Sequence, residues 1–558
     1  MRTAPRPADG PALLPPGGIG FLARGLLALA LLAGFYLLAL GIVGGLLAVD
    51  VLLAVNSAHP FGLGGLKVYA VSAVLAYPVL RTVFLTHRHK PAPEPLPGLS
   101  VGPAEQPVLW ERVRQLADEY GTRAPDELRL VAEANAQVCE DVRLLGLLPG
   151  RRRMELGIPL LIGFNQAELD AVIAHELGHF GNKDTRIGGL THSGRRAVAH
   201  TVHALHERAA RNRAAHAAEL AASAAVRRAK GRRTRTPQAS GGVDQVLARI
   251  FAAYAGLYLT VSAAVSRRQE IAADLAAVRL VGRDATASAL RRLPVIDTAL
   301  EYHLHRYAMV GWEDGLLPLP GQVYGGLAHL LAEPGRREEL GRLEPEAADA
   351  EHDPYDSHPP LPARIAAVES LPPDGRATTG SGPALALLSA PERTVAEVEA
   401  VTLPPESAGM TRLDWPELAR RTGRARHAAG VDALRQAVGR DLPAAALLAE
   451  VMTGHLREIA DRLPKSPQAR AATGRAAREF TRPVLRSALS DLVLIVLADA
   501  GTADWDVSWA EPVRLRLPDA VARGLPAALD AAVADVPDRQ PLRTLLADAG
   551  LPLPPAPC

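Results

Sequence analysis

Two histidines stand four residues apart in the chain, and a glutamate directly follows the first. His175, Glu176 and His179 lie in the mostly apolar stretch Ala171–Phe180. On a helix, residues at i and i+4 share a face, so the two imidazoles can bind one Zn²⁺ while Glu176 takes a proton from the metal-bound water. That arrangement suits hydrolysis by an activated water. The alternative is that so short a pattern arises by chance and that both histidines are ordinary surface residues.

The residues around this pattern favour a helix. Asn165 can cap its first turn, and that turn carries Glu168 and Asp170, whose negative charges are stabilising near a helix N-terminus. Apolar side chains recur on one stripe that a core can bury: Leu169, Val172, Ile173 and Leu177.

A second pair of polar residues at i and i+4, Glu270 and Asp274, stands in an otherwise apolar stretch. Glu270 can supply the third ligand of a catalytic zinc and leave the fourth position for water. Asp274, one helical turn further on, can accept the free N–H of His175 and fix its tautomer. The alternatives are that Glu270 is a solvated helix charge and that Asp274 forms an ion pair with Arg268 or Arg279.

Three motifs, in this order, resemble those of the gluzincin membrane zinc metallopeptidases that include HtpX and the CAAX prenyl proteases. They are Ala174–His179, Glu270–Asp274 and Ser357–Ile365. The third is similar to the family's Thr-His-Pro-x-x-x-x-Arg-Ile segment, with Ser357 in place of the threonine. Weaker similarities are Asn135–Ala136, Asn182 and Asp184. The resemblance covers about residues 104 to 372 and does not extend to the remainder of the chain.

The resemblance implies a mainly α-helical fold with a small β-sheet, which is an α+β zincin-type catalytic domain, and one Zn²⁺ per chain. It places His358 near the metal, where an imidazole can donate to the oxyanion of the tetrahedral intermediate, and it gives Arg364 the role of orienting that histidine. The alternative is that the His-Pro-Pro sequence only shapes a turn. It further implies that an extended polypeptide substrate adds as a strand beside the zinc helix.

The composition bears on the number of structural units, on nucleic-acid binding and on the redox compartment. The chain has 558 residues, 48% of them hydrophobic, so two or three structural units are expected. A formal charge of +2 is uninformative about partners, and no basic stripe interleaved with aromatic residues points to nucleic acid, so no nucleic-acid partner is expected. Two cysteines, Cys139 and Cys558, are too few for a disulfide framework, so a reducing cytoplasmic setting is expected.

The N-terminal region predicts a transmembrane hairpin, so that the lipid bilayer becomes a partner. No charge stands between Gly25 and Val49, a length that spans a bilayer, and a second span is predicted over Val68–Thr86. The alternative for the second stretch is a buried soluble helix. Positive charge flanks the outer ends of the pair, at Arg2 and Arg6 and at His87–Lys90, which puts both ends, and the catalytic domain, in the cytoplasm.

A further uncharged run, Ile250–Ser266, precedes Glu270. One crossing there would put Glu270 across the membrane from His175, and a compensating crossing over Arg186–His206 would bury arginines at a cost of at least about 2.5 kcal/mol each. We therefore expect this run to be a buried or membrane-surface helix that does not cross.

The expected division of the chain is an anchor (1–90), a Pro-rich linker (91–107), the metallopeptidase domain (108–371), a second linker (372–383) and a mostly helical C-terminal unit (384–558). Within it we predict a helix over Val108–Tyr120, strands over Glu127–Glu133 and Arg153–Ile162, and a hairpin near Trp505–Leu517.

Two functions are consistent with these features. One is a membrane-anchored zinc endopeptidase acting at the cytoplasmic face on membrane or membrane-associated proteins. The other is an anchored interaction scaffold that has a peptidase fold and acts through its C-terminal unit. The intact set of His175, Glu176, His179 and Glu270 favours the enzyme, because a scaffold has no physical need for it.

Overall fold

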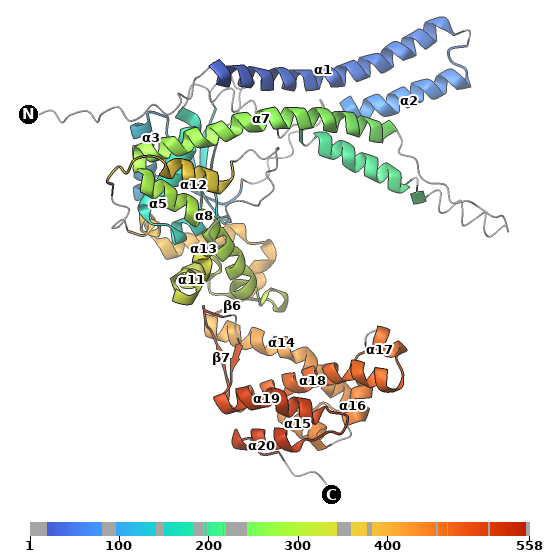
Figure 1. The fold of residues 1–558 in the computed structure, drawn as a ribbon, viewed down its shortest axis with the longest axis vertical. Helices are drawn as coiled ribbons and strands as arrows, with labels where there is room; N and C mark the ends of the chain where they lie inside the picture. Colours follow the sequence, from blue (N-terminus) through green and yellow to red (C-terminus); the bar gives the residue numbers. More distant parts are fainter. Residues whose placement is uncertain are drawn as a thin grey trace, which may run out of the picture. The chain divides into compact units, whose positions relative to one another are not determined.

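A computed structural model describes most of the chain. The described residues are 19–57, 59–80, 96–140, 150–181, 194–195, 198–199, 201–215, 217–218, 243–342, 359–376, 382–453, 456–465, 467–511 and 514–553. They are mainly helical with a small mixed sheet, as the sequence predicted (Figure 1). His358, Asn182 and Asp184 lie outside the described residues.

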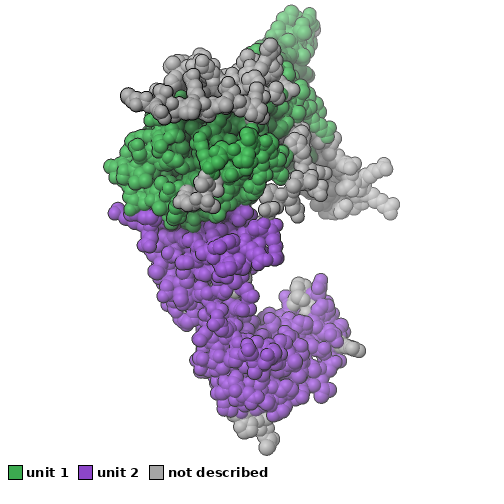
Figure 2. Space-filling model, turned by 60° about the vertical axis from the view of Figure 1, so that its left-hand side comes forward, with its two compact units in different colours: residues 1–131, 135–294, 344–389 green, residues 132–134, 295–343, 390–558 purple. Residues whose placement is uncertain are grey.

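The contacts divide the chain into two units (Figure 2). Unit 1 comprises residues 1–131, 135–294 and 344–389, and unit 2 comprises 132–134, 295–343 and 390–558. Unit 1 therefore contains the predicted linker 372–383, and unit 2 contains part of the predicted peptidase domain. The predicted domain division itself stays a prediction.

The sheet of unit 1 has four short strands in the order β1-β2-β4-β3. β2 and β4 are parallel, the two outer pairings are antiparallel, and β3 is an edge strand. The bounds are β1 Leu99–Val101, β2 Glu127–Val131, β3 Ala136–Glu140 and β4 Arg152–Gly157.

The predicted strand Arg153–Ile162 is wrong in its second half. Residues Ile158–Gly163 form helix α4, which has a proline in its first turn. Proline is well accommodated at the start of a helix, and a short apolar run does not by itself distinguish a buried strand from a buried helix.

Two helices pack near the sheet, one predicted with nearly correct bounds and the other predicted from its cap. α3 spans Pro107–Tyr120 and ends at Gly121, whose φ of 78° gives the left-handed cap. α5 spans Gln166–Gly181 and packs against α3 and the edge strand β3. The predicted cap is confirmed, because the Glu168 N–H donates to Asn165 Oδ1 and the Asn165 N–H donates to Glu168 Oε2, each at 2.9 Å.

Long apolar helices pack together in unit 1. α1 spans Ile19–Asn56, α2 spans Leu63–Leu80 and α7 spans Val243–Val281. They share one apolar core with the helical residues 194–195, 198–199, 201–215 and 217–218, which we call the outgoing segment. Within the described residues, α1 and α7 are the two helices that are long and apolar enough to cross a membrane.

The apolar part of α2, Leu63–Val74, is shorter than a span, and residues 81–86 of the predicted second span lie outside the described residues. The run Ile250–Ser266 is part of α7, which continues unbroken through Glu270.

The outgoing segment runs antiparallel to α7. Near its start, Arg195 donates to Ser262 Oγ at 3.0 Å, and further along Ala209 shares the core with Leu247. Since α7 runs opposite to the outgoing segment, its later residues, Glu270 among them, lie at the end of the pair where the outgoing segment begins. The antiparallel return accounts for the meeting of Glu270 and His175, and the expectation that Ile250–Ser266 does not cross the membrane stays a prediction.

Unit 1 is completed by α8, Arg283–His303, whose end passes into unit 2, by α12, Leu361–Glu369, and by the 3-10 helix η5, Ala384–Leu387. Leu290 of α8 packs with Ile365 and Val368 of α12.

Unit 2 is also mostly helical and has a large apolar core. The predicted hairpin is confirmed as β7 and β8, with Trp505 paired to Leu515. Trp509 lies outside it and stacks on Tyr307 at 4.8 Å between ring centroids. The other elements are η3 Leu304–Ala308, η4 Trp312–Asp314, β5 Leu316–Pro318, α9 Gln322–Gly325, α10 Leu327–Ala332, α11 Pro334–Gly341, α13 Pro391–Thr402, η6 Pro405–Gly409, β6 Thr411–Leu413, α14 Trp415–Val438, α15 Ala444–Thr453, α16 Leu456–Arg462, α17 Pro467–Ala471, α18 Gly474–Asp499, β7 Asp504–Asp506, β8 Arg514–Arg516, α19 Asp519–Ala532 and α20 Gln540–Asp548.

Candidate metal centre

The two imidazoles of α5 and a carboxylate of α7 converge on one point. His175 Nε2 and His179 Nε2 lie 3.3 Å apart. Glu270 places Oε2 at 3.6 Å from His175 Nε2 and Oε1 at 3.6 Å from His179 Nε2. The packing of α5 against α7 therefore unites the residues that the two sequence motifs had singled out separately.

These spacings fit a tetrahedral Zn²⁺ site. Bonds of about 2.0–2.1 Å at tetrahedral angles keep neighbouring ligand atoms roughly 3.3–3.4 Å apart. The separation of the two Nε2 atoms lies in that range, and the carboxylate is only slightly further away. Together with Glu176, the two histidines also form a group that could hold a metal ion, found among the described residues.

Asp274 fixes the state of the first histidine. Its Oδ1 lies 2.9 Å from His175 Nδ1, so that nitrogen carries the proton and Nε2 keeps its lone pair for a metal. Burial lowers the pKa of His175, but the hydrogen bond and charge of Asp274 outweigh burial and leave the pKa raised. Asp274 thus contacts the nitrogen of His175 that the sequence analysis named, and its effect on a bound metal stays a prediction.

Arg364 makes contacts that the sequence analysis did not predict. It donates to Asp274 through Nε at 2.8 Å and through Nη2 at 2.6 Å, and its Nη1 lies 3.3 Å from Glu270 Oε2. Asp274 is therefore paired with Arg364, and not with Arg268 or Arg279 as the alternative proposed. The predicted role of Arg364 in orienting His358 falls outside the described residues.

Glu176 contacts the edge strand. The Val138 N–H donates to Glu176 Oε2 at 3.2 Å, a contact that the sequence analysis did not anticipate. Burial raises the pKa of Glu176 to about 7, although the charge of His175 opposes the shift. A carboxylate with that pKa can both accept and return a proton near neutral pH.

His179 is held in its neutral form. Burial, together with the neighbouring charge of His175, lowers its pKa to about 4. Neutral imidazole is the form that binds a metal, so His179 needs no deprotonation at neutral pH.

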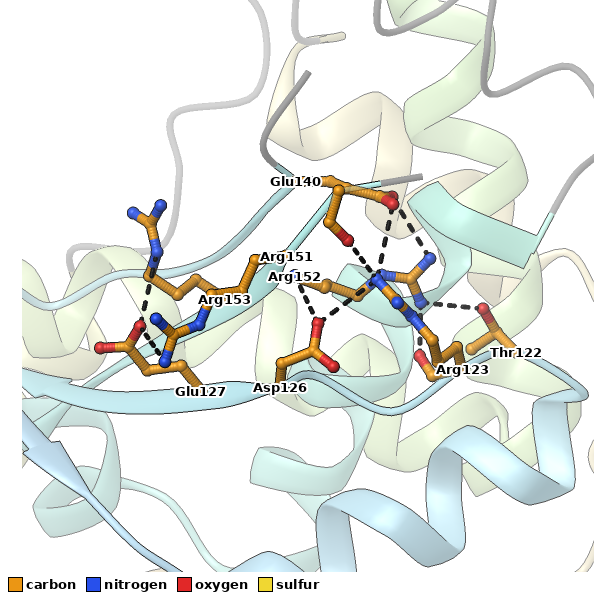
Figure 3. Close-up of polar contacts among 9 residues, drawn as sticks. Thr122, Arg123, Asp126, Glu127, Glu140, Arg151, Arg152 and Arg153 are labelled. Atoms are coloured by element: carbon orange, nitrogen blue, oxygen red, sulfur yellow. Dashed lines mark hydrogen bonds and ion pairs between the residues drawn. The ribbon is translucent and has the colours of Figure 1, made fainter. Parts of the chain in front are cut away.

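A polar network fixes the far end of the edge strand (Figure 3). Glu140, the last residue of β3, lies 3.4 Å from Nη2 of the buried Arg152 and 3.5 Å from Nη2 of Arg123. The Arg152 N–H donates to Asp126 Oδ2 at 2.8 Å. These bonds join β3, the start of β4 and the segment before β2. They hold the Glu140 end of β3 in place.

The site belongs to the class of zinc-dependent hydrolases in which two histidines and a glutamate share one helix. Comparison with protein families identifies the family: residues 103–371 match the model of Peptidase family M48, and this part of the chain is a domain of that family. That domain is a zinc metallopeptidase domain, and its His175, Glu176 and His179 form a group that could hold a metal ion. No curated protein matches the chain.

Proposed function

We propose that this protein is a membrane-anchored zinc endopeptidase that cleaves extended segments of membrane or membrane-associated proteins at the cytoplasmic face. The observation that carries the proposal is the set of distances between His175 Nε2, His179 Nε2 and the Glu270 carboxylate. These distances are close to those between neighbouring ligand atoms of a tetrahedral zinc site. In this assignment these three residues hold one Zn²⁺.

When bound, zinc polarises the scissile carbonyl and lowers the pKa of a water molecule. Glu176 would accept a proton from that water and later deliver it to the leaving amine. Asp274 keeps the proton on His175 Nδ1, and Arg364 holds Asp274 in place. His358 would donate to the oxyanion, and this role rests on the family resemblance alone.

The substrate would bind to β3 as an added strand. β3 is an edge strand, and its Val138 N–H is directed at Glu176 instead of at β4. Since the main chain of an edge strand can pair with any extended backbone, the substrate class is an extended polypeptide.

The anchor would consist of α1, α2, the outgoing segment and α7. α1 and α7 each contain a stretch that is long and apolar enough to cross a bilayer. Many large apolar side chains on these helices are exposed, as lipid-facing residues would be: Leu37, Leu47, Val55, Leu63, Val71, Val74 and Leu257. The cytoplasmic orientation of the catalytic site rests on the positive charge outside the α1–α2 pair.

The test compares the full-length protein in detergent with two variants. Glu176→Gln should keep the zinc content of the wild type and lose at least about a hundredfold in cleavage of a dye-labelled casein, since the base is gone. His179→Ala should lose both zinc and cleavage. Full cleavage by Glu176→Gln, or no zinc in the wild type, would contradict the proposal.

A further inference from the structure

Residues 382–389 continue the chain beyond the segment that matches the peptidase family, and none of them takes part in the chemistry proposed above. Half of the stretch forms η5, and the side chains of Ala384, Leu387 and Leu388 are buried in unit 1. η5 packs against α4 and against the metal-binding helix α5. This stretch, which we call the clamp, is thus part of the catalytic unit.

The clamp is bonded to the first residues of α5 through the backbone. Asn165 and Pro383 form an antiparallel bridge. On its two sides, the Gln166 N–H donates to the Gly382 carbonyl at 2.9 Å and the Ala384 N–H donates to the Phe164 carbonyl at 3.0 Å. The first N–H groups of a helix have no acceptor within the helix, and α5 begins at Gln166, so the clamp supplies the acceptor that this helix start lacks.

The other end of the clamp is bonded to α3. The Ser389 N–H donates to Oε1 of the buried Gln106, which directly precedes α3. Because α3 packs against α5, the clamp connects the starts of two neighbouring helices.

Buried carboxylates hold the same part of α5 from other directions. Ser288 donates to Glu168 Oε1 at 2.5 Å, and Arg112 donates to both oxygens of Asp170, at 2.8 and 2.5 Å. The start of α5 is therefore fixed by α8, α3 and the clamp together. His175 and His179 follow on the same unbroken helix, so the direction of its first turn determines where their nitrogens lie.

We propose that residues 382–389 are a positioning element of the metal centre: they hold the first turn of α5, and through it His175 and His179, in the orientation that matches Glu270 on α7. A metal site tolerates little displacement of its ligands, because the ligand atoms must stay near their ideal distances and angles. The peptidase unit of this chain therefore extends past the family-matched segment, to Ser389.

The experiment uses Co²⁺ in place of zinc, because its visible absorption reports the geometry of the ligands. The double variant Leu387→Ala/Leu388→Ala, made in the full-length protein in detergent, should bind Co²⁺ about tenfold more weakly and with an altered spectrum. Its kcat for dye-labelled casein should fall about tenfold, while KM changes less than twofold. The volume-conserving Leu387→Met/Leu388→Met should have the Co²⁺ spectrum of the wild type, and its Co²⁺ affinity and kcat should lie within twofold of the wild-type values.

Leu130→Ala is the matched control, because Leu130 is fully buried in β2, two strands away from the edge strand that α5 contacts. It should lower the melting temperature and leave the Co²⁺ affinity within twofold. Wild-type Co²⁺ affinity and spectrum in a folded Leu387→Ala/Leu388→Ala protein would overturn the proposal, and so would an equal loss of affinity in Leu130→Ala. Absence of Co²⁺ binding by the wild type would instead contradict the proposed function.

Should the double variant fail to fold, Ala384→Pro removes the N–H that donates to Phe164 and keeps Leu387 and Leu388. Ala384 is the first residue of η5, a position whose backbone suits proline. The same loss of Co²⁺ affinity is expected, and wild-type affinity in this folded variant would overturn the proposal.

Discussion

At the scale of single residues, Asp274 makes the clearest prediction. Burial alone would raise its pKa, but the hydrogen bonds from Arg364 and His175 outweigh burial and hold the pKa below its ordinary value. Asp274→Asn keeps the shape and loses the charge that fixes the His175 tautomer. Zinc affinity or activity should fall by roughly ten- to a hundredfold, the usual cost of losing an outer partner of a metal ligand, and a metal titration measures it.

The control for this change is Asp499→Asn. Asp499 pairs with Arg424 at a half-exposed site in unit 2, so its loss should cost at most about 1 kcal/mol and leave zinc binding unchanged. Wild-type zinc affinity and activity in Asp274→Asn would remove Asp274 from the site.

Sequence spacing was informative at this scale where partners share a helix. Residues at i and i+4 meet on any helix, so the face shared by His175 and His179 followed from the pattern alone. The ion pair of Arg364 with Asp274 joins residues 90 positions apart, and the Val138 amide reaches Glu176 across 38 positions. Such contacts depend on how elements pack, which no local pattern specifies. The Arg-Ile pair of the third motif was the one signal that pointed to Arg364.

At the scale of elements, the edge strand β3 provides the next prediction. The Val138 N–H is directed at Glu176, so it is not needed for the pairing of β3 with β4. Val138→Pro removes this N–H and should leave the sheet intact, since proline is tolerated on edge strands. A hydrogen bond to a charged group contributes about 1.5–3 kcal/mol, so kcat/KM for casein should fall roughly ten- to a hundredfold.

Cys139→Pro is the matched control on the neighbouring residue. Alternation along the strand turns the Cys139 N–H toward β4, so proline there should break the pairing and lower the melting temperature strongly. If Val138→Pro destabilises the protein as much as Cys139→Pro, or leaves kcat/KM unchanged, the assignment of this amide to catalysis is wrong.

Element types were easier to predict than element ends and partners. The helix over Pro107–Tyr120 and the cap at Asn165 followed from periodicity and from local hydrogen-bonding chemistry. The end of β4 did not, because the apolar run after Gly157 fits a strand and a helix equally well. The antiparallel packing of the outgoing segment on α7 could not be predicted from the sequence either. The outgoing segment is rich in charged and histidine residues, so it shows no clear apolar stripe.

At the scale of the whole molecule, the orientation in the membrane can be tested directly. A reporter that is active only in the cytoplasm, fused after Lys90, should be active if the positive charge outside the α1–α2 pair decides the topology. A reporter that is active only outside the cytoplasm, fused at the same position, serves as the control. Activity of the second reporter instead of the first would place the catalytic domain on the outer side.

The last prediction concerns the stability of unit 2, where His303 is fully buried among aromatic rings. Its Nε2 donates to the Val323 carbonyl at 3.0 Å, and its Nδ1 has no hydrogen-bond partner among the described residues. Burial lowers its pKa to about 4, although the hydrogen bonds to the backbone oppose the shift.

Between pH 6.5 and about 4, the unfolded chain therefore binds a proton at His303 that the folded chain does not bind. The free energy of unfolding is therefore not reduced by His303 above pH 6.5. It falls as the pH drops from 6.5 toward 4, by up to roughly 3 kcal/mol. Denaturant unfolding followed by tryptophan fluorescence measures it, because Trp312, Trp415, Trp505 and Trp509 lie in unit 2 and only Trp110 lies in unit 1. His303→Gln should make the free energy of unfolding depend less on pH over this interval. An unchanged pH dependence would show that His303 does not titrate as its burial requires.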